Sequence, residues 1–387
     1  MADRSLIFPA AEFRGRVARL QAQMAGQGLD ALLLTAQADI FYVTGFLTRF
    51  WESPARPWFV IVPNARDPVA VIPAIGAELM GRTWIETIRT WPAPQPEDDG
   101  VSLLIDTLCS LLPNSGRIGV PMGLETHLRM PLADYDRVAA GIAPRRFTDG
   151  THTVQRVREI KSETEVDAIR TTCAIAGRAF ERVPEIAGAG RPLDRVFRDF
   201  QSVLLDEGAD WVSYVSGAAA LGGYADVISP ALPDPIQAGD VLMLDTGAVR
   251  NGYFCYFDRN FAVGPVSDAV RRTHAALWRA TEDTLAALRP GMLARDAHRL
   301  IRDALVNHGA QPTEGRLGHG VGITLTEWPS FTPLDTTPLR AGMVLTIEPG
   351  AVVGPGRILV HEENIVLRSE GAELLTPRAP AEMPCLL

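Results

Sequence analysis

The sequence predicts two domains, an α/β domain over residues 1–154 and an α+β domain over residues 155–387. The chain has 387 residues, whereas a single domain usually takes about 100–200. Helix-like and strand-like segments alternate in the first part, which is typical of an α/β fold. In the second part, strand-like runs are interleaved with paired helices, which favours an α+β domain with antiparallel strands.

Periodicity and glycines define the elements of the first domain. Apolar residues between Phe13 and Met24 recur every three or four positions, so residues 11–25 are predicted to be helical. Gly28 suits the left-handed conformation that often follows a helix. Apolar runs bounded by turn residues predict the other elements: strands at 31–35, 40–46, 57–63, 68–73 and 117–120, and helices near 74–81 and 101–112.

A helix start marks the second domain. Ser162 and Glu165 fit a capping box, in which each side chain binds the backbone N–H of the other residue. We therefore expect the domain boundary just before this helix, near residues 150–158. The remaining pattern predicts helices at 162–180, 193–207, 267–288 and 294–308, and strands at 241–249, 252–263, 343–349 and 357–367.

A hairpin turn is predicted at Asn251-Gly252, because both residues tolerate the positive φ of a type I′ turn. With a two-residue loop, Asp245 lies opposite Asp258 on the partner strand. Two carboxylates that face each other repel unless a cation or a proton lies between them. The alternative is that one is solvated and the other is paired with Arg259.

Three further residues could complete a metal site. His319 stands between glycines, Glu348 ends an apolar strand, and Glu362 lies in another strand. A buried carboxylate is costly unless it is paired or bound to a metal, although each residue taken singly is also compatible with a structural role. The ordered set of four carboxylates and one imidazole suits Mn, Fe, Co or Zn: Asp245, Asp258, His319, Glu348 and Glu362.

Composition and charge exclude several classes of protein. The chain carries 37 Lys and Arg against 46 Asp and Glu, a net charge of −9, which argues against nucleic-acid binding. No run of about 18 apolar residues could span a membrane, and we expect a cytoplasmic protein. The four cysteines show no zinc-finger spacing, and we find no glycine-rich nucleotide motif.

Several motifs resemble, in order, those of the M24 metallopeptidases, which include methionine aminopeptidase, aminopeptidase P, prolidase and creatinase. They are LDTG (244–247), GYFCYFDRN (252–260), GHGVGITLTEWP (318–329), MVLTIEPG (343–350) and HEENIVL (361–367). YVTGF (42–46) and the segment 158–165 also look like the longer members. The resemblance implies a pita-bread catalytic domain behind a creatinase-type N-terminal domain, and a homodimer.

The resemblance also implies a ligand set with one departure. Family ligands carry over to Asp245, His319, Glu348 and Glu362. The family's second aspartate, which bridges two metal ions, falls on Tyr256, so Asp258 becomes a candidate replacement. We therefore expect at most one firmly bound divalent ion, with a metal-free site as the alternative.

Catalytic groups of the peptidases are also replaced. Gly223, just before Tyr224, and Thr326 stand where the family carries histidines. Val360 stands where proline-directed aminopeptidases carry arginine. Tyr224 and Thr326 would then line the substrate pocket. The resemblance therefore implies weak cleavage of Xaa-Pro peptides.

An aromatic loop at 50–58 could contribute to a pocket. Trp51 and Trp58 suit the binding of a cation by aromatic rings, and Arg56 suits the binding of a carboxylate. The alternative is a proline-stiffened loop that packs on its own domain.

Three functions remain open. The first is an M24-type hydrolase acting on a C–N bond of a short peptide or small molecule, with Glu348, Glu362 and Tyr256 as catalytic residues. A bound metal would lower the pKa of its water, and Glu348 would take a proton. The second is a metal-poor or mononuclear enzyme, either a creatinase-like hydrolase or a lyase that acts on a non-peptide molecule. The third is a catalytically silent binding protein.

Overall fold

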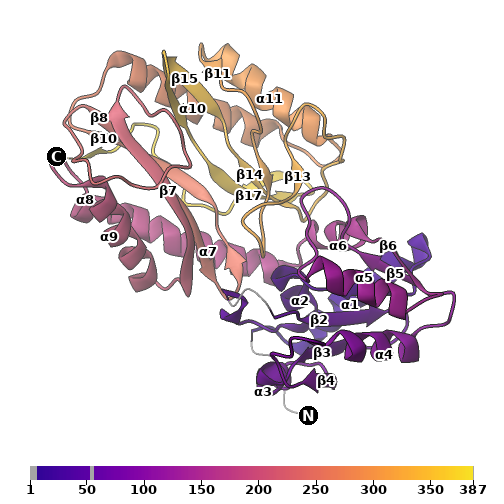
Figure 1. The fold of residues 1–387 in the computed structure, drawn as a ribbon. Helices are drawn as coiled ribbons and strands as arrows, with labels where there is room; N and C mark the ends of the chain where they lie inside the picture. Colours follow the sequence, from indigo (N-terminus) through magenta and orange to yellow (C-terminus); the bar gives the residue numbers. More distant parts are fainter. Residues whose placement is uncertain (1–6, 53–55, 387) are drawn as a thin grey trace. The chain divides into compact units, whose positions relative to one another are not determined.

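The computed structural model describes residues 7–52 and 56–386. The chain divides into two compact units, Met1–Arg158 and Glu159–Leu387 (Figure 1). The division falls at residue 158 rather than at the expected 154, because the helix that ends at Arg158 belongs to the first unit.

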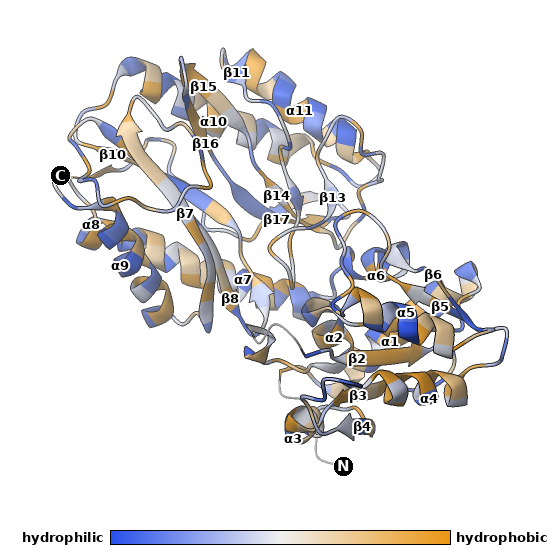
Figure 2. Cartoon of the chain, in the orientation of Figure 1, coloured by the Kyte–Doolittle hydropathy of each residue, from blue (hydrophilic) through white to orange (hydrophobic). Residues whose placement is uncertain are grey.

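The first unit is built on a mixed six-stranded sheet in the order β4-β3-β2-β1-β5-β6. Strands β1, β2 and β3 are buried along their whole length, which explains their continuous apolar sequence and the orange colour of β2 in Figure 2. The elements are α1 (Ala10–Gln27), β1 (Ala31–Leu34), α2 (Gln37–Thr44), η1 (Phe50–Glu52), β2 (Phe59–Pro63), β3 (Val69–Pro73), η2 (Ala74–Gly76), α3 (Ala77–Met80), β4 (Thr87–Trp91), α4 (Val101–Leu111), β5 (Arg117–Val120), α5 (Leu132–Gly141), β6 (Arg146–Asp149) and α6 (Thr151–Arg158).

The strand predicted at 40–46 is wrong, because this segment forms most of the helix α2. Five consecutive residues, from Ile40 to Thr44, are buried. A helix that is buried on every side has no amphipathic stripe, so its sequence resembles that of a buried strand. Gly45 ends the helix with φ of +77°, and a Cβ atom there would lie 2.8 Å from the ring of Phe13.

The second unit combines helices with three sheets whose pairs are antiparallel, except for β10 with β19. This confirms the predicted α+β domain. The sheet orders are β19-β10-β8-β7 with β9 beside β8, β11-β15-β16, and β13-β12-β14-β17-β18. The helices are α7 (Glu163–Glu181), α8 (Val183–Ile186), α9 (Leu193–Asp206), α10 (Asp268–Ala287) and α11 (Ala294–Asn307). The strands are β7 (Trp211–Leu221), β8 (Asp240–Arg250), β9 (Tyr253–Phe254), β10 (Phe257–Val263), β11 (Gln311–Pro312), β12 (His319–Gly320), β13 (Glu327–Ser330), β14 (Val344–Ile347), β15 (Gly350–Gly354), β16 (Arg357–Val360), β17 (Glu363–Arg368), β18 (Gly371–Leu374) and β19 (Cys385–Leu386).

The predicted hairpin is confirmed together with its register. Asn251 and Gly252 have positive φ values of +52° and +80°, as a type I′ turn requires. Asp258 pairs with Asp245. The second strand is interrupted, however, because residues 255–256 belong to neither β9 nor β10.

The helices of the second unit hold the strands by one apolar face. The predicted capping box of Ser162 and Glu165 starts α7. In Figure 2, α9 and α11 each carry blue hydrophilic and orange hydrophobic residues. Buried residues of α10 and α11 pack with those of β8, β14 and β17 in one core cluster. Within the described ranges, no helix is both long and apolar enough to cross a membrane.

Candidate metal centre

Three donor side chains converge where neighbouring strands of one sheet begin or end. His319 begins β12, Glu348 follows β14 directly, and Glu362 precedes β17 directly. β12, β14 and β17 are neighbours in the sheet, so residues from distant parts of the chain meet there. One donor atom from each of the three side chains lies within 4.8 Å of the other two.

Backbone contacts fix the orientation of the His319 ring. The Nδ1 atom lies 2.7 Å from the carbonyl oxygen of Gly320, and the backbone N–H of His319 donates to Oγ1 of Thr346 at 2.9 Å. A neutral ring in this position carries its proton on Nδ1 and presents a lone pair on Nε2, as metal-binding histidines do. Nε2 lies 2.9 Å from Oε1 of Glu348. That contact is favourable only with a proton or a metal ion between the two atoms.

The two glutamates of this cluster have opposite electrostatic surroundings. Against the effect of burial, His319 lowers the pKa of the Glu348 carboxyl to about 2. Burial and the nearby charge of Glu348 raise the pKa of Glu362 well above its usual value. Glu348 also accepts a hydrogen bond from the Thr346 hydroxyl, so its carboxylate is held in place.

Asp245 and Asp258 face each other beside this cluster. Their exposed fractions are 5% and 2%, and Oδ1 of Asp258 accepts the backbone N–H of Glu362 at 3.2 Å. Burial raises the pKa of Asp258 to about 7, and burial together with Asp258 raises the pKa of Asp245. Two buried carboxyls so arranged cannot both stay ionised without a cation.

Arg259 does not provide that cation. Its Nη2 pairs with Glu363 at 3.0 Å, and its Nη1 donates to the carbonyl oxygens of Asp258 and Glu362 at 2.6 and 3.0 Å. The guanidinium therefore lies on the opposite face of β10 from the Asp258 carboxylate, as strand alternation requires.

Three buried metal-donor atoms of this site form no hydrogen bond within the described part of the chain. They are Oδ1 of Asp245, Nε2 of His319 and Oε1 of Glu362. Leaving buried polar atoms unpaired is costly, and coordination of a cation would satisfy them. Oxygen atoms and one imidazole are donors that Mn, Fe, Co and Zn accept. The residues present therefore fit a divalent metal ion.

Tyr256 lies in the gap between β9 and β10. Its backbone N–H donates to Oδ1 of Asn364 at 2.9 Å, and its carbonyl accepts from the same side chain. The ring packs on His319 and Tyr214, with centroids 5.5 and 5.9 Å apart. Burial and the charge of Asp245 raise the pKa of Tyr256, so its phenol keeps its proton.

Tyr224 is fully buried and links two strands. Its hydroxyl accepts the backbone N–H of Val360 at 2.7 Å and pairs with Oδ1 of Asn260 at 3.0 Å. The side chain thus ties β16 to β10 instead of presenting a free polar group. The neighbouring Gly223 has φ of +107°, and a Cβ atom there would lie 2.7 Å from the carbonyl oxygen of Ile358. A histidine does not fit at this position without a shift of β16.

Thr326 lies half-buried in the turn before β13. Its carbonyl oxygen accepts the hydroxyl of Thr324 at 2.8 Å, and Glu327 accepts the backbone N–H groups of Ile323 and Thr324. Glu327 in turn pairs with the buried Lys161 at 2.9 Å. These contacts hold the turn that follows His319.

The aromatic residues of the loop 50–58 pack within the first unit. Trp58 is 2% exposed and contacts Trp51 with ring centroids 5.6 Å apart. The guanidinium of Arg56 lies over the ring of Phe50, and its backbone carbonyl accepts from Arg129. Residues 53–55 of this loop lie outside the described part of the chain.

Sequence reasoning did not assign a role to three residues of the site. Thr346 shares a strand face with Glu348 by period two, a signal that could have indicated it. Asn364 shares a face with Glu362 in the same way. Tyr214 gave no signal, because only the pairing of β7 with β8 in the sheet brings it to Tyr256.

Comparisons with known proteins identify the family of both domains. Residues 167–370 match the family model of metallopeptidase family M24, and residues 16–160 match that of the creatinase/prolidase N-terminal domain. A probable dipeptidase PepE from Mycobacterium bovis is 28% identical over 384 residues, which is 97% of each chain. An Xaa-Pro dipeptidase from Pyrococcus horikoshii is 27% identical over 91% of this chain and 94% of its own.

Solved structures show the same fold. The dipeptidase PepE from Mycobacterium ulcerans superposes with a TM-score of 0.84 at 26% identity, covering 98% of this chain and 99% of that one. A prolidase from Pyrococcus horikoshii gives a TM-score of 0.81 at 21% identity, covering 94% and 99%. The chain therefore belongs to metallopeptidase family M24, with a pita-bread catalytic domain behind a creatinase/prolidase N-terminal domain.

Proposed function

We propose that this protein is a metal-dependent hydrolase that cleaves the C–N bond of a dipeptide or another short peptide. The observation that carries the proposal is the convergence of donor atoms from His319, Glu348 and Glu362 within 4.8 Å. The Mycobacterium relatives that match along nearly the whole chain are named as probable dipeptidases. A catalytically silent protein would gain nothing from these buried carboxylates, which are costly when unpaired.

We further propose that one divalent ion binds firmly. His319, Glu348 and Glu362 would hold it. Asp245 is outside this group of three, but its charge acts on Glu362 and its Oδ1 forms no hydrogen bond, so it is a candidate fourth ligand. A second ion would need a carboxylate near Tyr256. Asp258 is two residues further along the chain, about 6.6 Å for extended backbone, and its Oδ1 already accepts the N–H of Glu362. When bound, such an ion lowers the pKa of a water molecule and polarises a carbonyl group.

The chain's own residues would then position the substrate and move protons. As a metal ligand Glu348 would be ionised, so its carboxylate could accept a proton from the attacking water. Tyr256 keeps its phenolic proton, so it can donate a hydrogen bond to the oxygen that becomes negative in the transition state. The backbone N–H of Glu362 donates to Oδ1 of Asp258 at 3.2 Å. This hydrogen bond holds Glu362, a proposed metal ligand, in place.

We expect this activity to be weak toward Xaa-Pro peptides. Gly223, Thr326 and Val360 stand where the resembling peptidases carry two histidines and an arginine. The contact with Ile358 that excludes a side chain at Gly223 supports this expectation. Loss of a proton-transfer group typically lowers a rate by about 10²–10⁴.

The test combines metal content with hydrolysis of a dipeptide panel that includes both Xaa-Pro and other dipeptides. Metal would be measured by mass spectrometry on protein purified without a chelator. Glu348→Gln is expected to lower kcat/KM by about 10²–10⁴ and to weaken metal retention. The matched control is Glu314→Gln, which removes a carboxylate whose side chain is 93% exposed and should change neither quantity.

Two outcomes would contradict the proposal. One is a protein that holds its metal ion but hydrolyses no dipeptide in the panel. The other is dipeptide hydrolysis that persists after complete metal removal or in Glu348→Gln. Efficient cleavage of Xaa-Pro dipeptides, abolished in Glu348→Gln, would overturn only the expected weakness toward proline.

A further inference from the structure

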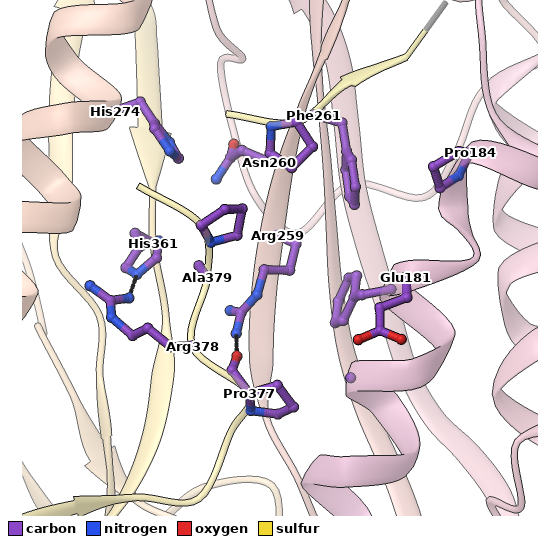
Figure 3. Close-up of a pocket in the computed structure, with 14 residues that line it drawn as sticks. Glu181, Pro184, Arg259, Asn260, Phe261, His274, His361, Pro377, Arg378 and Ala379 are labelled. Carbon is purple, nitrogen blue, oxygen red and sulfur yellow. Dashed lines mark hydrogen bonds between the residues drawn. The ribbon is translucent and has the colours of Figure 1, made fainter. Parts of the chain in front are cut away.

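A pocket in the catalytic domain is lined by none of the proposed metal ligands (Figure 3). It has a volume of about 250 Å³ and is bounded by α7, β10, α10 and the segment 377–384. Arg259 lines it, and this side chain points to the opposite face of β10 from Asp258. An apolar cavity of about 150 Å³ already admits benzene. The space therefore suits one ring with a small substituent.

Most of the lining is apolar and rigid. Phe180 comes from α7, Phe261 from β10, and Pro377, Pro380 and Pro384 from the C-terminal segment. Aromatic and proline side chains lose little freedom when a ligand binds. Such walls favour a flat apolar body, as in most small-molecule pockets.

The arginines of the pocket are already paired. Arg259 pairs with Glu363 at 3.0 Å, and Arg378 pairs with Glu363 and Glu282 at 2.7 Å each. Glu181 lines the pocket as an exposed side chain. An anionic ligand would meet no unpaired cation among the described residues that line the pocket, and the only carboxylate among them, Glu181, is exposed to water, so a neutral ligand is favoured.

His274 is the polar side chain of the pocket to which the proposed catalytic function gives no role. It is 4% exposed, and neither ring nitrogen forms a hydrogen bond within the described part of the chain. Burial and the nearby His361 lower the pKa of His274 to about 4, although a contact of the ring with the Pro380 backbone, which does not reach hydrogen-bond geometry, partly opposes this shift. The neutral ring offers one N–H donor and one acceptor. Figure 3 shows it directed from α10 toward the side chains on β10.

His361 cannot play the same role. Its Nε2 atom already accepts from Nη1 of Arg378 at 2.8 Å, and the same atom lies 3.4 Å from Glu363. The two histidine rings are nearly perpendicular, with centroids 6.5 Å apart. His274 therefore remains the polar group of the pocket that a ligand can satisfy.

We propose that this pocket is a second binding site, separate from the metal centre, for a small neutral aromatic molecule that carries a hydroxyl or an amide group. The aromatic ring lies between Phe180, Phe261 and the prolines. The polar substituent forms a hydrogen bond with the buried imidazole of His274. The site needs neither the metal ion nor the catalytic residues.

The test is calorimetric titration of the full-length protein with phenol and benzamide as polar probes and with toluene as the apolar probe. All three are expected to bind saturably. His274→Leu removes both ring nitrogens at similar volume and is expected to weaken phenol and benzamide roughly tenfold, while toluene changes little. Ala379→Leu fills the cavity and is expected to abolish binding of all three.

Matched controls separate this site from the proposed metal centre. Glu181→Gln removes an exposed charge at the pocket and should leave the affinity for a neutral probe unchanged. Probe binding should also persist in Glu348→Gln, so failure of the proposed function and failure of this proposal are distinguishable. Circular dichroism would verify that each variant is folded.

Two results would overturn the proposal. The first is the absence of saturable binding of any probe by the natural chain up to the solubility limit. The second is binding of phenol and benzamide that is unchanged in both His274→Leu and Ala379→Leu. If one of these variants fails to fold, the other still tests the site, because one removes the hydrogen bonds and the other removes the space.

Discussion

Replacing Tyr256 by aspartate is expected to create a second metal position and to make stability depend strongly on metal. The new carboxylate would lie near Asp245, Glu362 and Glu348, whose charges already raise the pKa of Tyr256. An uncompensated buried charge costs about 3–5 kcal/mol. In a domain of this size, 1 kcal/mol shifts Tm by about 2–4 °C. In chelator, Tm of Tyr256→Asp should therefore fall by about 6–20 °C.

Excess metal should reverse this loss. An ion at about a thousand times its Kd stabilises the folded state by about 4 kcal/mol, which is close to the expected penalty. The assay is scanning calorimetry of the natural chain and Tyr256→Asp, with chelator and then with Mn²⁺, together with the metal content. Stoichiometry should rise from about one ion toward two only in Tyr256→Asp. Tyr256→Asp need not cleave Xaa-Pro dipeptides for these expectations on metal content and stability to hold.

Tyr256→Phe is the matched control, because it keeps the ring that packs on His319 and Tyr214 and adds no charge. It should bind one ion and show the metal dependence of the natural chain. The reasoning is refuted if the natural chain already holds two ions at full occupancy. It is also refuted if Tyr256→Asp binds one ion and melts like Tyr256→Phe in chelator.

Three further predictions rest on other parts of the structure. In urea denaturation, Gly223→Ala should destabilise the protein by at least about 1 kcal/mol more than Gly222→Ala does. Both glycines have positive φ, but only a Cβ atom at Gly223 would meet backbone. Equal losses of stability in the two variants would contradict this. The pKa of His274 is lowered to about 4 from an ordinary value near 6.5. The neutral ring therefore stabilises the folded state fully above pH ~6.5, and this contribution, about 3 kcal/mol, is lost as the pH falls toward 4. His274→Leu should reduce the pH dependence of the free energy of unfolding by that amount. The protein should be a homodimer, and light scattering that shows a stable monomer at micromolar concentration would oppose this. Arg56→Ala should raise KM without lowering Tm, and a large fall in Tm would oppose a role of Arg56 in substrate binding.

The sequence alone determined the parts of the fold that depend on local rules. Asn251-Gly252 fixed the hairpin and placed Asp245 opposite Asp258, because a two-residue type I′ loop leaves one possible register. The capping box at Ser162 marked the start of α7. The same rules failed at 40–46, where a helix buried on all sides carries no periodic signal.

Only the tertiary structure decided how the chemical groups are used. Arg259 is beside Asp258 in sequence, yet it pairs with Glu363 because strand alternation directs it to the other face. The clash at Gly223 arises from β16, which is more than a hundred residues away in the chain. His274 becomes a buried imidazole without a hydrogen bond only because α10, β10 and the C-terminal segment enclose it. Local sequence specifies turns and caps, whereas burial and pairing depend on contacts between distant segments, which no single stretch of sequence contains.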